Sequence, residues 1–307
     1  MDKKINSVKY HGTLTLPKTK LFNQVNQLLK EKPEHRNFYK KILCSAEHFN
    51  KSALVFNKPT RQFKEHIEKL KSGEPLDYII GFTEFLGCKI DLSKKPFIPR
   101  SETEFWVNEA ISKLHMVNSK IINNKLLVIS HKPLTVLDMF VGSGCIGIAI
   151  LKHIPSAFVV FAEKNKEFLE QIKINCEINK IPKNRYKIVQ SDVFSNVKDN
   201  PSTSLRARFD YIFANPPYIA TVRKNKIQKS VLKYEPHEAL FGGEDGMIYI
   251  RKFLAEAKNF LNNSGKIYME FDYIQKEEIR KLLFKLGYEK FKFFKDQYGK
   301  WRYLTVE

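Results

Sequence analysis

The chain has 307 residues, enough for about two domains that each bury a hydrophobic core. Hydrophobic residues make up 43% of it and charged residues 28%, the proportions of a soluble globular protein. No apolar run approaches the ~18 residues of a membrane-spanning helix, and the first residues have neither a signal-peptide core nor the arginines of a transit peptide. We therefore expect a cytoplasmic protein, with a mitochondrial location as the alternative, and no membrane partner.

The formal net charge of +20 favours an anionic partner such as nucleic acid or a ribosome-associated protein. The charge is spread rather than clustered, however, so direct nucleic-acid binding is allowed but not required. The four cysteines contain no C-x-x-C pair, which is neither a zinc pattern nor a disulfide framework and predicts reduced thiols and no metal site. A monomer is expected.

Residues 1–74 have the apolar spacing of helices, for example at Phe63, Ile67 and Leu70, and Ser72-Gly73 ends the last of these helices. The region contains 16 Lys and Arg against 7 Asp and Glu, so it carries +9 of the total charge. We expect a small basic helical domain suited to docking a partner. A solvated basic surface without a partner is the equal alternative.

The pattern changes at Pro75. Residues 78–81 and 85–90 are expected to form two short strands of a β-hairpin, which makes residues 75–97 a linker. Ser101 is expected to cap a helix that runs to about Leu114, with Glu104 completing a capping box. Residues 116–132 are a polar insertion for which no element is predicted.

Strands and helices alternate in the remainder of residues 98–307, which predicts an α/β domain with a mostly parallel sheet covered on both faces. The last two strands meet near Tyr298-Gly299 and are expected to form an antiparallel edge. The expected strands are 134–140, 157–162, 186–190, 209–214, 265–271, 288–295 and 301–306, and the expected helices are 144–153, 165–180, 246–261 and 276–286.

The tetrad Asn215-Pro216-Pro217-Tyr218 follows the apolar strand 209–214, at the carboxyl end where open α/β sheets bind ligands. Two prolines stiffen this loop and leave carbonyl oxygens exposed as acceptors. The Asn215 side-chain oxygen and such a carbonyl can together grip an NH2 group, and Tyr218 supplies a flat wall. The N-P-P-Y pattern resembles that of methyltransferases that alkylate a planar nitrogen, either a base amino group or a glutamine amide. A rigid strand-end turn is the alternative without a function.

A glycine turn between the first strand of the sheet and the next helix predicts a cofactor site. Gly142 and Gly144 let the backbone approach a ligand, and the helix N-terminus offers free N–H groups. Glu163 ends the next strand, where an acid can accept from both ribose hydroxyls, and Asp192 ends the third, where it can accept from an adenine amino group.

The spacing of Gly142, Gly144 and Gly147 also fits nicotinamide and flavin enzymes. Asp138 at the start of the turn and the tetrad after the fourth strand favour S-adenosyl-L-methionine instead. The expected cofactor-binding residues are Asp138, Phe140, Val141, Gly142, Ser143, Gly144, Glu163, Asp192, Val193 and Asn215.

From about residue 34 to its end, the chain resembles the HemK/PrmC family of peptide-chain release factor glutamine methyltransferases. Family members typically carry glycine where this chain has Phe140, so we expect a repacked turn there. Besides the tetrad, the resemblance lies in the segments 74–81, 84–87, 98–104, 234–236 and 239–246, and in Glu270 and Gln275.

The resemblance implies a Rossmann-like class I methyltransferase domain after a helical substrate-recognition domain and a β-hairpin. It implies methyl transfer from S-adenosyl-L-methionine to a glutamine amide in the Gly-Gly-Gln loop of release factors, with S-adenosyl-L-homocysteine as the second product. Asn215 and Pro216 would accept the amide hydrogens, Tyr218 would pack on the amide, and Pro217 and Arg100 would help bind the substrate. The alternatives are an adenine-N6 methyltransferase for DNA or RNA, a glutamine methyltransferase for a ribosomal protein, and a non-catalytic binding protein.

Overall fold

The computed structural model describes residues 61–122, 125–128, 133–197 and 208–307, and the chain divides into two compact units, residues 1–69 and 70–307. Of residues 1–69 the structure describes only 61–69, which belong to the helix α3 (Arg61–Lys71) and confirm the helix predicted for this segment. Gly73, with a φ of 82°, follows it as predicted. The other helices predicted for the first 60 residues lie outside the described residues.

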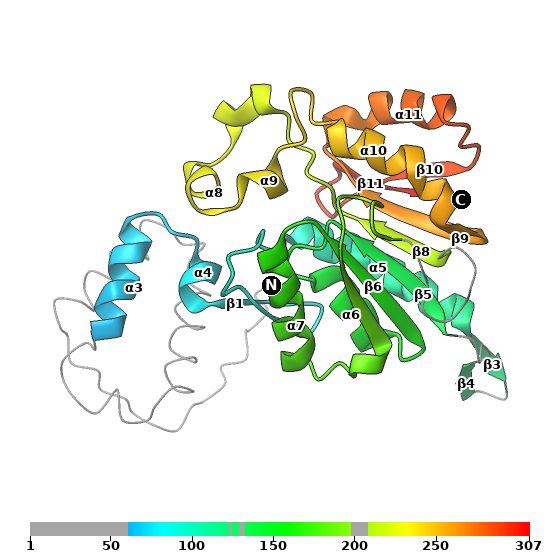
Figure 1. Cartoon of the computed structure of the whole chain (residues 1–307), viewed down its shortest axis with the longest axis horizontal. Helices are drawn as coiled ribbons and strands as arrows, with labels where there is room; N and C mark the ends of the chain where they lie inside the picture. The colour runs from blue at the N-terminus through cyan, green and yellow to red at the C-terminus, as the bar shows by residue number, and fades with distance from the viewer. Residues whose placement is uncertain (1–60, 123–124, 129–132, 198–207) are drawn as a thin grey trace, which may run out of the picture. The chain divides into compact units, whose positions relative to one another are not determined.

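A seven-stranded sheet forms the centre of the larger unit (Figure 1), in the order β10-β11-β9-β8-β5-β6-β7. The five strands from β9 to β7 are parallel to one another, and β11 pairs antiparallel with both β9 and β10. The predicted fold class is therefore confirmed. The strands are β5 (Leu134–Met139), β6 (Ala157–Glu163), β7 (Tyr186–Gln190), β8 (Phe209–Ala214), β9 (Leu261–Glu270), β10 (Phe291–Lys295) and β11 (Trp301–Val306).

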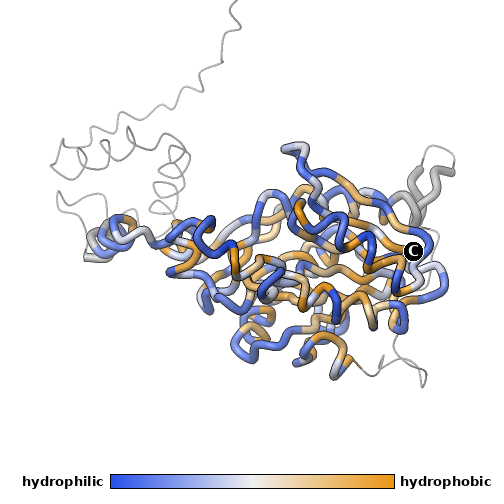
Figure 2. The backbone as a smooth tube through the Cα atoms, turned by 90° about the horizontal axis from the view of Figure 1, so that it is seen from above, coloured by the Kyte–Doolittle hydropathy of each residue, from blue (hydrophilic) through white to orange (hydrophobic). Residues whose placement is uncertain are grey.

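Helices cover both faces of the sheet because successive strand residues point to opposite sides. Val136 on β5 belongs to one hydrophobic core with Trp106, whereas the next residue, Leu137, belongs to the other with Phe253. The hydrophobic segments accordingly run through the interior of this unit in Figure 2. One core is covered by α5 (Ser101–Asn118), α6 (Cys145–His153) and α7 (Lys166–Ile178), and the other by α10 (Ile248–Ala257) and α11 (Lys276–Lys285).

The strand predicted for residues 78–81 is wrong, because Tyr78, Ile79 and Ile80 belong to the short helix α4 (Leu76–Ile80). The Pro75 carbonyl accepts from the Tyr78 and Ile79 amides, and Gly81, with a φ of 86°, ends the helix in the left-handed region. A hairpin does follow, formed by β1 (Phe82–Phe85) and β2 (Cys88–Asp91), but its turn at Leu86 and Gly87 lies inside the predicted strand 85–90.

Three amide side chains, two on α7 and one at its C-terminal end, bind the backbone of this hairpin and of Lys94 after it. Asn175 Oδ1 accepts from the Asp91 amide at 2.7 Å, Asn179 Oδ1 from the Lys89 amide at 3.1 Å, and Gln171 Oε1 from the Lys94 amide at 2.9 Å. Residues four apart share a helix face, so the spacing of 171, 175 and 179 lets one helix bind an edge strand. Residues 82–91 are thus fixed to the α/β part of the fold.

The capping box predicted for Ser101 and Glu104 is also wrong. Glu104 Oε1 accepts from the backbone amide of Leu86 at 2.7 Å, and the Ser101 hydroxyl donates to Glu102. Leu86, in the hairpin turn, has a φ of 47°. Its backbone N–H is therefore a donor from outside the helix that begins at Ser101. The insertion contains a further hairpin, β3 (Ser119–Ile122) with β4 (Lys125–Val128), for which no element was predicted.

Candidate active site

The strand order changes direction between β5 and β8, and one cavity opens at the carboxyl ends of the strands there. Open α/β sheets bind ligands at such a switch point. Segments from four neighbouring strands line this cavity, which brings together most of the residues predicted for cofactor and substrate. The predicted residues that line it are Phe140, Val141, Gly142, Ser143, Glu163, Asp192, Val193, Asn215, Pro216, Pro217 and Tyr218.

The glycine turn after β5 has the backbone shape that the sequence predicted. Gly142 and Gly144 have φ angles of 56° and 85°, and a Cβ on Gly144 would lie 3.1 Å from Ile148 Cδ1. Phe140 has a φ of 60°, a left-handed conformation that bulky residues seldom adopt. Its ring is held edge-on against Tyr249 and Phe253 at centroid distances of 5.9 and 6.1 Å. This packing accommodates a phenylalanine at that position of the turn.

Glu163 ends β6 at the floor of the cavity and is 8% exposed. Its two oxygens accept from the backbone amides of Gly142 at 2.9 Å and Asn165 at 2.8 Å. Burial raises the pKa of this carboxyl, while the bonds from Asn165 and Gly142 oppose the rise. The carboxylate therefore fixes the glycine turn as well as facing the cavity.

Asp138 lies behind the turn and does not line the cavity. Its Oδ2 accepts from the Gly147 amide at 2.9 Å, and a Cβ on Gly147 would come within 2.9 Å of that oxygen. Its Oδ1 is the one buried side-chain N or O atom without a partner in the described part of the chain. Burial raises the pKa of Asp138 to about 8, because water no longer solvates the charged form.

Asp192 and Val193 form the wall contributed by the loop after β7. Asp192 is exposed and forms an ion pair with Lys164 at 2.8 Å. Val193 has a φ of 52°, so a second non-glycine residue of the cavity has a left-handed backbone. Strained backbone of this kind concentrates at ligand sites. Gly144 is buried beside Ile172 and is not among the residues that line the cavity.

The N-P-P-Y tetrad forms the opposite wall, directly after β8. Asn215 and Tyr218 are half-buried, and both prolines are buried. The chain turns tightly against the loop formed by residues 242–246, where Gln275 Nε2 donates both to the Tyr218 carbonyl at 2.9 Å and to the Gly246 carbonyl at 3.1 Å. Gln275, shortly after β9, therefore ties the tetrad to the 242–246 loop.

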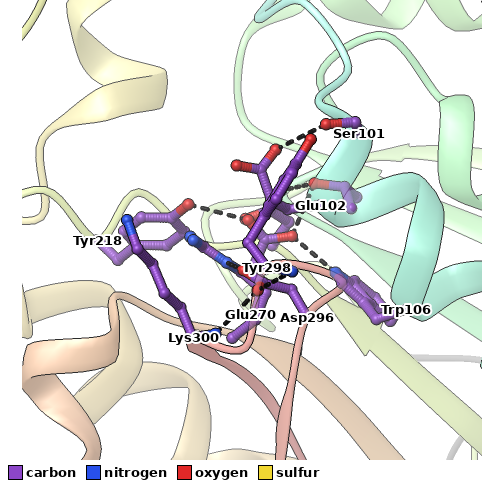
Figure 3. Close-up of polar contacts among 11 residues, drawn as sticks. Ser101, Glu102, Trp106, Tyr218, Glu270, Asp296, Tyr298 and Lys300 are labelled. Carbon is purple, nitrogen blue, oxygen red and sulfur yellow. Dashed lines mark hydrogen bonds and ion pairs between the residues drawn. The ribbon is translucent and has the colours of Figure 1, made fainter.

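A buried carboxylate beneath the tetrad was not predicted as a site residue. Glu270, the last residue of β9, accepts from Thr103 Oγ1 and Trp106 Nε1 at 2.7 Å each and from the Tyr218 hydroxyl at 2.9 Å (Figure 3). Thr103 also lines the cavity. The sequence marked Glu270 through the family resemblance alone, because nothing local to it reveals three donors from distant segments.

Arg100 does not line the cavity. Its guanidinium forms an ion pair with Glu235 and lies 4.6 Å from the ring centroid of Phe97, which does line it. Glu235 is buried and also accepts from the Ile98 amide at 3.2 Å. Arg100 therefore connects the start of α5 to the segment that covers the cavity.

The described residues contain neither a metal-binding cluster nor a membrane-spanning helix. No three or more of their His, Cys, Asp or Glu side chains are grouped so that they would hold a metal ion. No described helix has both the length and the apolar character needed to cross a membrane.

Comparison with known proteins relates the chain to methyltransferases. A family model described as "Conserved hypothetical protein 95" matches residues 112–276. The release factor glutamine methyltransferase of Flavobacterium psychrophilum is 31% identical over 246 residues, which cover 80% of this chain and 79% of that protein. That of Streptococcus pneumoniae is 31% identical, with 82% of each chain covered. A bifunctional methyltransferase of Rickettsia felis is 30% identical, and the match covers 77% of this chain and 46% of that protein.

Solved structures share the fold at low sequence identity. The catalytic domain of hMettl16, in complex with a MAT2A 3'UTR hairpin, superposes with a TM-score of 0.51 at 14% identity and covers 72% of this chain and 76% of that one. At this identity the likeness concerns the fold alone. It agrees with a class I methyltransferase sheet.

Proposed function

We propose, because the chain belongs to the release factor glutamine methyltransferase family, that it methylates the side-chain amide nitrogen of a glutamine in peptide-chain release factors. S-adenosyl-L-methionine is the proposed methyl donor, and the glutamine of the Gly-Gly-Gln loop is the proposed acceptor, giving N5-methylglutamine. One observation supports this most directly. Residues of the N-P-P-Y tetrad, of the glycine turn and Glu163 all line the same cavity.

The residues that line the cavity suit this cofactor chemically. Gly142 and Ser143 would approach its methionyl end at the N-terminus of α6, where backbone N–H groups favour negative charge. Glu163 would accept from the ribose hydroxyls, and Asp192 and Val193 would border the adenine. Asp138 would act through the turn, by holding Gly147. When bound, S-adenosyl-L-methionine supplies an electrophilic methyl group on a sulfonium.

The protein's part in the reaction is to orient a weak nucleophile. An amide nitrogen shares its lone pair with the carbonyl, so positioning matters more than the strength of a base. Asn215 Oδ1 and the Pro216 carbonyl would accept the two amide hydrogens and favour the positive charge that develops on nitrogen. Tyr218 is a neutral phenol, because burial and the neighbouring Glu270 raise its pKa well above the ordinary value. It would pack on the amide plane rather than take a proton.

We propose Arg100 and Pro217 as substrate-binding residues that act through the shape of the site. Pro217 is buried in the wall of the cavity, and Arg100 holds Glu235, two residues before α9 (His237–Leu240). Leu240 and Ala239 of this helix line the cavity. Loss of the Arg100 side chain would therefore leave the segment with Ala239 and Leu240, which forms part of the cavity wall, less firmly held.

The experiment incubates the purified protein with labelled S-adenosyl-L-methionine and either an intact release factor, a ribosomal protein, duplex DNA or ribosomal RNA. We expect label on the loop glutamine of the release factor, located by mass spectrometry. Asn215→Ala should lower turnover by about 100-fold or more, since several kcal/mol of orientation is lost, and should leave cofactor affinity within about threefold.

Glu163→Gln is the matched variant, because it should weaken cofactor binding, which Asn215→Ala should leave nearly unchanged. We expect it to weaken cofactor affinity in calorimetry by about 1–3 kcal/mol, the value of hydrogen bonds to a charged acceptor. Label on adenine and none on any protein glutamine would overturn the proposed function. Label on a ribosomal protein alone would mean that the enzyme methylates glutamine in a different protein substrate.

A further inference from the structure

The carboxylate of Glu270 reaches two cavity residues without lining the cavity itself. It is 2% exposed, and its partners Thr103 and Tyr218 both line the cavity. Figure 3 shows the Tyr218 hydroxyl and the Trp106 ring directed toward it from either side. Burial raises the pKa of Glu270, but bonds from Trp106 and Thr103 and the charge of Arg302 oppose the shift. Both oxygens accept hydrogen bonds, which favours the ionised form.

The direction of the hydrogen bonds follows from this carboxylate. A hydroxyl has one hydrogen, and that of Thr103 goes to Glu270 Oε2 at 2.7 Å. Thr103 Oγ1 can then only accept from other groups. The side-chain nitrogen of Asn215 lies 3.4 Å from it and donates. The Asn215 oxygen is consequently the end that points away from Thr103.

This direction decides what Asn215 offers to a substrate. The two ends of an asparagine amide have nearly the same shape, so packing alone discriminates poorly between them. With nitrogen toward Thr103, the oxygen is free to accept from an NH2 group. With the amide turned over, Asn215 would present its own NH2 hydrogens to the hydrogens of that group. The substrate nitrogen would then have only the Pro216 carbonyl as an acceptor.

A second branch of the same carboxylate fixes Tyr218. Its hydroxyl donates to Glu270 Oε1 at 2.9 Å, which sets the position of the ring that forms the flat wall. Arg302 stabilises the negative charge and is itself held by Asp296, whose Oδ2 accepts from Arg302 Nε at 3.0 Å. Two residues of the tetrad therefore depend on one buried charge.

We propose that Glu270 is a positioning residue for methyl transfer: through Thr103 it keeps the Asn215 amide with its oxygen toward the acceptor nitrogen, and through its second oxygen it holds the Tyr218 ring. This role rests on the proposed function for the identity of the substrate amide. The orientation of Asn215 does not, because it is a property of the protein alone.

The test uses the full chain with two substitutions at one position. Thr103→Val has nearly the shape of threonine and removes the hydroxyl, whereas Thr103→Ser keeps it. We expect Thr103→Val to lower kcat for methylation of an intact release factor by about tenfold or more, the value of one buried hydrogen bond. The KM for S-adenosyl-L-methionine should stay within about threefold, because Thr103 is not among the groups proposed to bind it. Thr103→Ser should restore most of the lost kcat.

A second readout does not depend on turnover. In NMR spectra of the wild-type protein, the side-chain NH2 hydrogens of Asn215 should show nuclear Overhauser contacts to Thr103, and these should vanish in Thr103→Val. If Thr103→Val fails to fold, Glu270→Gln replaces it, because its amide offers one acceptor oxygen where the carboxylate offers two. Absence of these contacts in the wild-type protein, or an unchanged kcat in the variant, would overturn the proposal. A wild-type protein that methylates no glutamine but shows the predicted contacts would refute the proposed function and leave the orientation standing.

Discussion

At the scale of single residues, Asp138 is a carboxyl group that the fold keeps away from water. One oxygen accepts from Gly147, the other has no partner among the described residues, and burial raises the pKa to about 8. In the unfolded chain an aspartic acid loses its proton near pH 4. Between these values the folded state holds a proton that the unfolded state has lost. The free energy of unfolding should therefore fall as the pH rises from about 4 to about 8.

Asp138→Asn should remove this part of the pH dependence, since an asparagine oxygen can still accept from Gly147 and carries no titrating proton. Urea unfolding of the cofactor-free protein at about pH 5 and about pH 8 measures how far the stability of each protein changes with pH. We expect the variant to gain stability relative to wild type at the higher pH, by at most about 5 kcal/mol, because a tenfold change in proton affinity corresponds to about 1.4 kcal/mol. An equal pH dependence in the two proteins would mean that Asp138 is ionised in the folded protein.

Phe140 illustrates how a residue departs from a family pattern. The position requires a φ of 60°, which glycine adopts freely and phenylalanine adopts at a cost of about 1–2 kcal/mol. Contacts of the ring with Tyr249 and Phe253 offset this cost. A glycine at this position could adopt the same backbone shape without that cost.

At the scale of elements, the segment 219–247 is fitted closely to the N-P-P-Y loop. Ile219 pairs with Phe241, and the Gly242 amide donates to the Ile219 carbonyl at 3.0 Å. A Cβ on Gly242 would lie 2.4 Å from the Pro217 carbonyl oxygen. Gly242 is thus needed because two backbones touch at the wall of the cavity.

Gly246→Ala tests this fit. Gly246 has a φ of 76°, and an added Cβ would lie 2.2 Å from the Tyr218 carbonyl oxygen. We expect the tetrad to shift, with turnover lowered by about tenfold or more, because small displacements at a reacting centre have large effects on rate. Turnover of the proposed glutamine methylation and thermal unfolding of the variant provide the measurement.

Gly287→Ala is the matched control, because Gly287 has a similar φ of 70° and an added Cβ would meet nothing within 4 Å. It should lose about 1–2 kcal/mol of stability from backbone strain alone and keep its turnover. Equal losses of turnover in the two variants would show that strain, and not contact with the tetrad, decides the effect.

At the scale of the whole molecule, the unit formed by residues 70–307 contains every residue that we place in the site, together with the cores on both faces of its sheet. The basic segment before it carries +9 of the charge of +20. We therefore propose that residues 1–74 recognise the protein substrate, that residues 75–97 link them to the catalytic domain, and that residues 98–307 carry the chemistry.

Removal of residues 1–69 should separate these roles. We expect cofactor affinity within about threefold of wild type and similar turnover of a short Gly-Gly-Gln peptide, whereas the KM for the intact release factor should rise by about tenfold or more, since docking contacts are lost. Calorimetry and steady-state kinetics on both substrates give the comparison. A parallel rise of KM for the peptide would contradict a docking role for this segment.

Features that depend on neighbouring residues could be predicted from the amino-acid sequence alone. The alternation of apolar segments predicted β7, β8 and β11 at their observed bounds, because strand and helix periods are local properties. The glycines at 142 and 144 and the prolines at 216 and 217 likewise mark a turn and a stiff loop wherever the chain folds. Their places at the ends of β5 and β8 were therefore readable in advance.

Which groups meet across long separations in the sequence depends on how the chain folds. Thr103 and Glu270 are 167 residues apart, and no pattern in either segment announces the hydrogen bond between them. Glu104 binds the Leu86 amide instead of its own helix end, because the fold brings this half-buried backbone donor of the hairpin turn within reach. A polar side chain bonds the partner that the fold brings within reach. The bond between Thr103 and Glu270 in this way sets the orientation of Asn215, on which the proposed chemistry depends.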